Sequence, residues 1–229
     1  MPRFPFALAS LLQLGSLSAV AASPVQPAAA DIFVETAFRL GVPRDYASAS
    51  GLHHVREPQQ LALIGGRDAL GYAQRLIPQA ARAWARMREA AAREGVELRA
   101  VSTFRSVEAQ LAIVRAKLAR GQTIDAILRV NAAPGYSEHH SGRAIDIGTS
   151  GYAPTEEEFE RSPAFAWLKR NAAAYGFDLS YPRGNPHALA YEPWHWYWRG
   201  DDAESTLPLT ELAASNDSPA PTNLFTRSR

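Results

Sequence analysis

The sequence predicts one α+β domain, built as a central antiparallel sheet with helices on one side. Three observations support this fold class. The chain has 229 residues, enough for one domain with a sizeable core and some unstructured length. Helical periodicities come early in the chain and short strand-like segments come later. The composition, 46% hydrophobic and 21% charged, is that of an ordinary globular protein, and the sequence contains no internal repeat.

The N-terminus has the features of a secretory signal. Arg3 precedes the apolar run FPFALASLLQLGSLSAVA, which ends in the small-residue pattern of a cleavage site. Glutamine, glycine and serine residues dilute this run, which argues against the alternative of a membrane anchor. We therefore expect a signal peptide over 1–21, a Pro/Ala linker over 22–30, and an exported protein, periplasmic or extracellular, with no membrane span after cleavage.

Charge and cysteine content narrow the classes of partner and cofactor. The chain has no cysteine, so disulfides and thiolate ligands are excluded and any metal must be held by histidine and carboxylate. Lysine and arginine number 24 against 23 acidic residues, which gives no support for nucleic acid or an anionic membrane as a partner. We expect a monomer.

The first half of the expected domain, residues 31–200, is mainly helical. Asp31 is a plausible N-cap and Gly41 a stop for a helix over 31–41. Apolar residues at three- and four-residue steps predict the longest helical stretch over 68–94, which Pro78 can kink or divide.

The later elements are shorter. Residues 96–102 are expected to form a strand, followed by helices over 106–121 and 123–130 and a strand over 142–148. Ser162 and Pro163 begin a helix that ends at Gly176. Residues 177–181 and 194–198 are further strand candidates, and the unpatterned tail over 201–229 is expected to be disordered.

The segment SEHHSGRAIDIG, residues 137–148, concentrates polar groups that could do chemistry. If its second half is a strand, Ile145 and Ile147 face the core, and Asp146 faces the opposite way between small residues. Gly142 lets the chain turn, so that His139 can fold back over Asp146.

A second polar cluster lies in YEPWHWYW, residues 191–198. Its three tryptophans share one face of a strand, with His195 on the other and Glu192 three residues earlier. Together with His139 and Asp146, His195 completes a set of two imidazoles and one carboxylate, which suits Zn²⁺ with an open position for water. Glu192 would carry the proton of that water. The alternative is chance spacing around a tryptophan-rich core strand.

These residues carry a family resemblance. SEHHSGRAID resembles the S-x-H-x-x-G-x-A-x-D motif of the VanY-type D-alanyl-D-alanine carboxypeptidases, zinc peptidases of the LAS group. EPWH resembles their E-x-W-H motif, and VSTFRSVEAQ is similar to their S-x-x-R-S…Q segment. The resemblance covers residues 68–200. One departure is STF where the family commonly has Ser-Gly-Tyr, which leaves the arginine in place.

The resemblance implies a Hedgehog/DD-peptidase-like fold and a role for each matching residue. It makes His139, Asp146 and His195 the zinc ligands and Glu192 the catalytic glutamate. It makes Arg105 the residue that steadies the substrate or the developing oxyanion, with Ser137 and Gln110 lining the cleft. His140 is expected to be turned away from the metal, as a supporting residue or a wall. The remaining histidines match no motif and are expected on the surface or in loops: His53, His54 and His187.

The expected function is hydrolysis of the terminal D-alanine of peptidoglycan stem peptides by an exported zinc-dependent carboxypeptidase. One alternative is L,D-carboxypeptidase or cross-link endopeptidase activity with the same zinc machinery. Another is a non-catalytic, zinc-containing wall-binding module, against which the free carboxylate of Glu192 argues. Arg105, Ser137 and Gln110 are all candidates to hold the terminal carboxylate.

Overall fold

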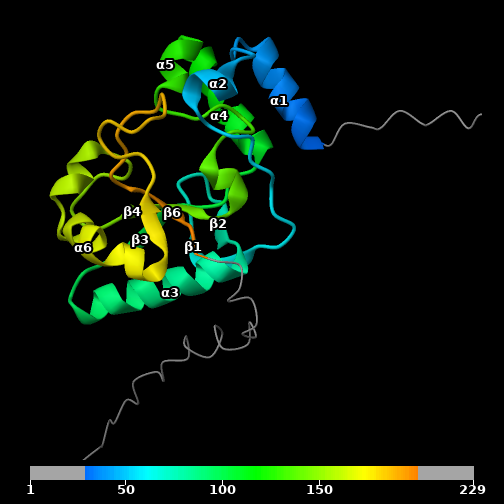
Figure 1. Cartoon of the computed structure of the whole chain (residues 1–229). Coiled ribbons are helices and arrows are strands. Elements are labelled where there is room, and N and C mark those ends of the chain that lie inside the picture. Colours follow the sequence, from blue (N-terminus) through cyan, green and yellow to red (C-terminus); the bar gives the residue numbers. More distant parts are fainter. Residues whose placement is uncertain (1–28, 201–229) are drawn as a thin grey trace, which may run out of the picture.

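A computed structural model describes residues 29–200 (Figure 1). The expected signal peptide, most of the linker and the tail lie outside the described residues. The helices are α1 Ala29–Arg39, α2 Tyr46–Ser50, α3 Pro78–Arg93, α4 Val107–Ala119, α5 Ile124–Leu128 and α6 Pro163–Asn171, with 3₁₀ turns η1 Glu138–Ser141, η2 Glu157–Arg161 and η3 Ala172–Tyr175. The strands are β1 Ala62–Arg67, β2 Ala73–Leu76, β3 Arg99–Ser102, β4 Ala144–Gly148, β5 Phe177–Leu179 and β6 His195–Trp198.

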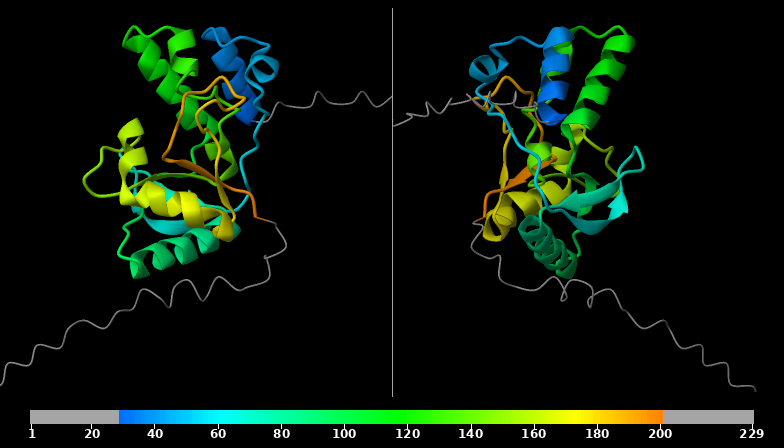
Figure 2. Two further views of the ribbon diagram at one scale, coloured as in Figure 1. Left: turned by 60° about the vertical axis from the view of Figure 1, so that its left-hand side comes forward. Right: turned by 90° about the vertical axis from the view of Figure 1, so that its right-hand side faces the viewer.

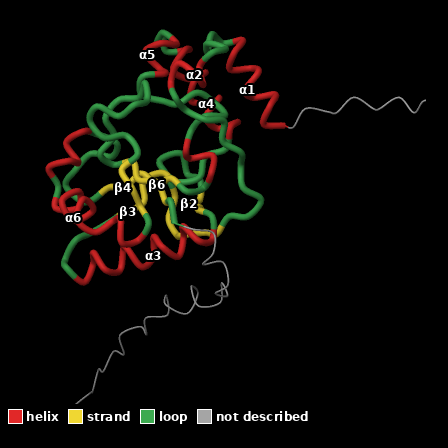
Figure 3. The backbone as a smooth tube through the Cα atoms, viewed as in Figure 1, coloured by secondary structure: helices red, strands yellow, loops and turns green. Residues whose placement is uncertain are grey.

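A four-stranded antiparallel sheet, ordered β3-β4-β6-β5, lies at the centre of the molecule (Figure 3). Ile145 and Ile147 on β4 and Trp196 on β6 belong to one buried cluster with Trp84 of α3 and Trp167 of α6. The face of the sheet that carries these apolar residues is therefore covered by α3 and α6, and the predicted α+β class is confirmed. The opposite face carries Asp146 and remains available for the site.

The helices α1, α2, α4 and α5 gather at the other end of the molecule (Figure 2). They enclose a second buried cluster that includes Val34 of α1, Tyr46 of α2, Leu111 of α4 and Leu128 of α5. The polar face of the sheet therefore faces this separate group of helices. Strand ends and connecting loops lie between the sheet and these helices.

The predicted helix over 68–94 is wrong in its first part. The helix begins at Pro78, where the missing N–H costs nothing because the first helical N–H groups have no partner within the helix. The preceding residues form an antiparallel hairpin of β1 and β2, with Leu70 largely exposed in its turn. Pro78 therefore starts the helix and does not kink it.

The hairpin supports the segment that follows β3. The Gln74 side chain donates to the carbonyl of Val101 at 2.8 Å and accepts from the Thr103 hydroxyl at 2.7 Å. That same hydroxyl accepts from the backbone N–H of Arg75 at 2.9 Å. These bonds fix residues 101–103, and the Thr103 carbonyl in this segment lies 2.6 Å from Nδ1 of His139 in the site described below.

The remaining boundaries follow the expected capping chemistry. Ser162 caps α6 through its hydroxyl, as expected, and Ser106 caps α4 in the same way. Asp31 lies in the first turn of α1 and not at its N-cap, because the helix starts at Ala29. Within residues 29–200, none of the helices has the length and apolar character needed to cross a bilayer.

Candidate metal centre

Asp146 and His195 are brought together by strand pairing. They are directly opposite residues in the antiparallel pair of β4 and β6. Opposite residues of such a pair project from the same face of the sheet, so the two side chains meet. The Nδ1 atom of His195 lies 3.0 Å from Oδ1 of Asp146, and both residues are buried.

His139 reaches the same point from the turn before β4. It lies in η1, whose N-cap is Ser137 and whose C-cap is Gly142 in the left-handed conformation, with φ of 67°. A Cβ at residue 142 would lie only 2.9 Å from Cδ2 of Leu61, so the position favours glycine for both reasons. The turn at Gly142 brings His139 Nε2 to 3.3 Å from Oδ2 of Asp146, as expected from the sequence.

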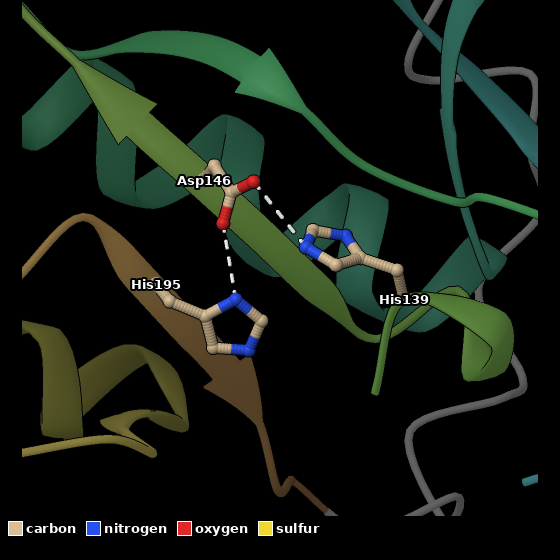
Figure 4. A group of neighbouring side chains, drawn as sticks. All are labelled: His139, Asp146 and His195. Atoms are coloured by element: carbon tan, nitrogen blue, oxygen red, sulfur yellow. Dashed lines mark hydrogen bonds and ion pairs between the residues drawn. The ribbon is translucent and has the colours of Figure 1, made fainter. Parts of the chain in front are cut away.

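The hydrogen bonds around His139 show which of its nitrogens is free. Its Nδ1 lies 2.6 Å from the carbonyl oxygen of Thr103, and a carbonyl can only accept. Nδ1 therefore carries the proton, and the lone pair of Nε2 faces the Asp146 carboxylate. Figure 4 shows the Asp146 side chain between the two rings, with one oxygen toward each.

This donor set fits a divalent metal ion. One ligand atom each from His139, Asp146 and His195 can be chosen so that all lie within 4.8 Å of one another, the only such group found among residues 29–200. A lone pair and a carboxylate oxygen repel each other unless a cation or proton lies between them. Two imidazoles and one carboxylate with a position left open are the ligands of a catalytic zinc site.

The pKa values of the metal-free group also indicate that a cation belongs between these side chains. Burial alone would raise the pKa of Asp146, but the two histidines outweigh burial and hold that pKa well below its usual range. Burial would lower the pKa of His195, but hydrogen bonds to Asp146 and Glu138 outweigh burial and raise the pKa of His195 to about 10. A proton on His195 supplies the positive charge that a metal ion would replace.

His140 does not point toward the metal group and instead anchors η1. Its Nε2 accepts from the backbone N–H of Gly135 at 3.1 Å, and its Nδ1 lies 2.6 Å from the carbonyl oxygen of Arg105. The ring is completely buried, and burial lowers its pKa to about 4. His140 is therefore neutral, and its two hydrogen bonds connect η1 to the segments that contain Gly135 and Arg105.

Glu192 lies beside the metal group without belonging to it. Its Oε2 is 3.8 Å from Nδ1 of His195, and its backbone N–H donates to the carbonyl of Tyr181 at 3.0 Å. Burial raises the pKa of Glu192 to about 7. A carboxyl group with that pKa can both accept and release a proton near neutral pH.

Arg105 is held in place by two neutral side chains. Its Nη1 donates to Oε1 of Gln110 at 2.8 Å and its Nη2 to the hydroxyl of Ser102 at 2.9 Å. The amide nitrogen of Gln110 donates to the carbonyl of Ala132 at 2.7 Å. Gln110 is thus occupied by protein contacts and orients Arg105, while the Ser137 hydroxyl accepts from the backbone N–H of His139 at 3.4 Å.

All the residues singled out from the sequence for the site line one cleft of about 460 Å³. The cleft also contains residues that sequence reasoning missed. Lys117 on α4 donates to Asn131, and both line the cleft, as do Tyr181 and Trp194. Their lining position follows from tertiary structure, and no local pattern in the sequence indicates it.

Glu138 is a further residue that the sequence did not single out. Its Oε2 lies 2.9 Å from Nε2 of His195, on the opposite side of the ring from Asp146. The three remaining histidines lie outside the metal group. His53 and His187 line a second hollow, and the ring of His54 contacts the ring of Tyr136 edge-on.

Comparison with known proteins agrees with this geometry. The family model VanY, described as D-alanyl-D-alanine carboxypeptidase, matches residues 73–201. YodJ of Bacillus subtilis (strain 168) is 35% identical over 137 residues, which are 58% of this chain and 50% of that protein. The chain spans half or less of the length of several curated relatives that it matches.

Two solved structures are similar to the chain. The LdcB LD-carboxypeptidase is 31% identical, with a TM-score of 0.57, over 65% of this chain and 72% of that one. A mutant of the vancomycin resistance D,D-pentapeptidase VanY, solved in complex with Zn(II), is 28% identical, with a TM-score of 0.48, over 66% of this chain and 86% of that one.

Proposed function

Because the chain belongs to the VanY D-alanyl-D-alanine carboxypeptidase family, we propose that it is a zinc-dependent carboxypeptidase that removes the terminal D-alanine from peptidoglycan stem peptides. The observation that carries this proposal is the position of Glu192. A partly buried carboxylate, 3.8 Å from a metal-binding histidine and not itself a ligand, is placed to carry a proton, which a purely structural site does not need.

The residues of the cleft divide the work of hydrolysis. When bound, Zn²⁺ lowers the pKa of water and polarises a carbonyl group. Glu192 accepts the proton of the attacking water and passes it to the leaving amine, and its position beside His195 without being a ligand leaves it free for this transfer. Arg105, fixed by Gln110 and Ser102, directs its guanidinium at the negative charge that develops on the scissile carbonyl oxygen.

Two cationic side chains in the cleft can bind carboxylates of a peptide, while Glu156 and Glu157 line another part of it. Arg105 and Lys117 are both among its lining residues, and Lys117 lies two helical turns along α4 from Gln110. A stem peptide carries a terminal carboxylate and a further carboxylate at its γ-linked D-glutamate. Arg105 is a stronger candidate than Gln110 for the terminal carboxylate as well as for the oxyanion. It is charged and has five N–H donors, of which two bond Gln110 and Ser102, whereas Gln110 is neutral and its oxygen and nitrogen both bond protein groups.

A second candidate function is L,D-carboxypeptidase activity. The similarity to the LdcB LD-carboxypeptidase, with 31% identity and a TM-score of 0.57, favours it. Both activities use the same metal ligands and proton carrier, and they differ in the stereochemistry of the residue before the cut. A third arrangement, cleavage of cross-links, would need the cleft to accept a branched peptide.

Defined substrates separate these possibilities. The purified enzyme is incubated with a pentapeptide stem, a tetrapeptide stem and a cross-linked dimer, and the products are identified by mass spectrometry. Loss of D-alanine from the pentapeptide supports D,D-carboxypeptidase activity, and loss from the tetrapeptide alone supports L,D activity. Binding of a stem by the zinc-loaded protein without any cleavage would support the wall-binding module and overturn the proposal.

The proposed substrate lies outside the cytoplasmic membrane. The secretory signal expected over residues 1–21 supports export to that compartment. N-terminal sequencing of the protein recovered from outside the cytoplasm, compared with the full chain, tests this part of the proposal.

A further inference from the structure

Glu138 stands one residue before the ligand His139, yet it serves a different histidine. Its Oε2 atom lies 2.9 Å from Nε2 of His195, while Nδ1 of His195 lies 3.0 Å from Asp146. The His195 ring is therefore held between two carboxylates, one on the metal side and one behind it. His195 is 3% exposed, so no solvent replaces either contact.

We propose that Glu138 is a positioning residue that holds the Nε2–H of His195 and so makes Nδ1 the metal-binding nitrogen. A carboxylate only accepts hydrogen bonds, so the bond to Glu138 fixes the proton on Nε2 and leaves the lone pair on Nδ1. A negatively charged acceptor also draws the shared proton toward itself, which makes the opposite nitrogen a stronger electron donor to a metal.

The two histidine ligands are supported unequally. Behind His139 lies the neutral carbonyl of Thr103, at 2.6 Å from Nδ1. Behind His195 lies the charged Glu138. Asp146 and Glu138 together supply two negative charges, which balance the two positive charges of a divalent ion. Glu192 is therefore not needed for charge balance and is free to carry a proton.

The position of Glu138 indicates that it supports His195 and does not contact the substrate. Glu138 is absent from the lining of the 460 Å³ cleft that contains Glu192 and Arg105. It instead lines a separate hollow of about 370 Å³, together with Tyr136, His187 and Arg199. Glu138 contacts His195 from outside the catalytic cleft, so we expect its effect on the reaction to pass through this metal ligand.

One turn of 3₁₀ helix thus supports both histidines of the centre. Successive residues of such a turn project about 120° apart. This spacing lets His139 enter the metal group directly while Glu138 passes behind His195. The inference concerns the metal centre and not the reaction proposed above, so zinc affinity tests it even if the enzyme cleaves no stem peptide.

The test is zinc affinity, measured by chelator competition on the full chain. Glu138→Gln keeps the shape and one accepting oxygen but removes the charge, and zinc should bind about 10- to 100-fold more weakly. The matched control is Glu158→Gln, an exposed glutamate in η2 that lines neither cavity and should leave zinc affinity unchanged. A zinc affinity of Glu138→Gln within twofold of wild type would overturn the inference.

A second measurement uses the wild-type protein alone, so it does not depend on whether a variant folds. Nitrogen–proton correlation spectra of the histidine rings in zinc-loaded wild type should show His195 protonated at Nε2 and bound through Nδ1. Binding through Nε2 would overturn the inference. If Glu138 had only a structural role, Glu138→Gln would lower the thermal midpoint of the metal-free protein and leave zinc affinity unchanged. Measuring both quantities on this variant therefore distinguishes the two roles.

Discussion

Asp146 and His195 face each other across the β4 and β6 pair, although 49 residues separate them in the chain. Their alignment depends on the register of two short strands. A slip of one residue would turn His195 into the core and bring a tryptophan to the metal group. The apolar residues on the other face, among them Ile145, Ile147 and Trp196, prevent that slip because they are buried against α3 and α6. The core thus fixes the geometry of the metal centre.

His139→Ala should abolish stoichiometric zinc binding, because it removes one of three protein ligands. We expect wild type to bind one zinc per chain when metal is supplied. His140→Ala should still bind one zinc at saturating metal, since its nitrogens bond to backbone groups of Gly135 and Arg105. Metal analysis of the purified proteins checks both. Loss of zinc from His140→Ala alone would show that the metal site has been assigned to the wrong histidine.

The stability of the metal-free protein should depend on His140 below neutral pH. Burial lowers the pKa of His140 from 6.5 to about 4, so the unfolded chain binds more protons at this residue between those values. The contribution of the neutral ring is fully present above pH 6.5 and is lost as pH falls toward 4. At its limit it amounts to about 3 kcal/mol, which corresponds to the change in pKa from 6.5 to about 4.

Urea unfolding of wild type and His140→Ala, each with chelator present, measures this effect between pH 4 and 7. The difference in unfolding free energy between the two proteins should shrink as the pH falls. A difference that stays constant across this range would show that His140 does not titrate in the way its burial requires.

Much of the metal centre could be predicted because it depends on local periodicity. The alternation of Ile145, Asp146 and Ile147 shows which side chain leaves the core, and Gly142 marks the turn that returns His139. Both positions follow from the spacing of residues within one segment.

The hairpin of β1 and β2 escaped prediction for the opposite reason. Its first strand is exposed at most positions and contains two glycines, so the buried alternation that indicates a strand is missing. Apolar residues between Leu70 and Leu76 recur at helical steps and continue into the true helix at Pro78. Side-chain bonds from Gln74 to a distant segment, and not local propensity, show where this hairpin belongs.

Glu138 escaped prediction because its partner is distant. In the sequence it is one polar residue in a polar turn, and its significance depends on His195, which lies 57 residues later. Lys117 is similar, since a single lysine near the end of a helix is normally solvated. Only the packing of α4 along the cleft distinguishes it.

Lys117→Gln should weaken binding of stem peptides that carry a free D-glutamate carboxylate. The loss of one charged hydrogen bond predicts a KM about tenfold higher with kcat little changed. Lys117→Arg, which keeps the charge, should stay close to wild type. Steady-state kinetics on stems with D-glutamate and with its amide measure the effect. An equal KM increase on both substrates would rule out recognition of that carboxylate.

Glu192→Gln should bind zinc and fold like wild type but lose most of its turnover. The amide occupies nearly the same volume, and His139, Asp146 and His195 still provide the ligands. The glutamine amide cannot accept a proton from water. The kcat of the variant should therefore fall by about two to four orders of magnitude, the usual effect of losing a positioned acid or base. Glu156→Gln is the matched control, because Glu156 lines the same cleft but is exposed, and it should retain near-normal kcat.

The pH profile adds a second test of Glu192. Burial raises its pKa to about 7, and a nearby divalent ion lowers that value again, so the activity of wild type should fall on the acid side at a pH below about 7. Rate must be lost as pH falls, because a protonated carboxyl cannot act as the base. Glu192→Gln should lack this dependence in its residual activity. A variant that kept nearly full activity with the same acid limb would show that another group activates the water.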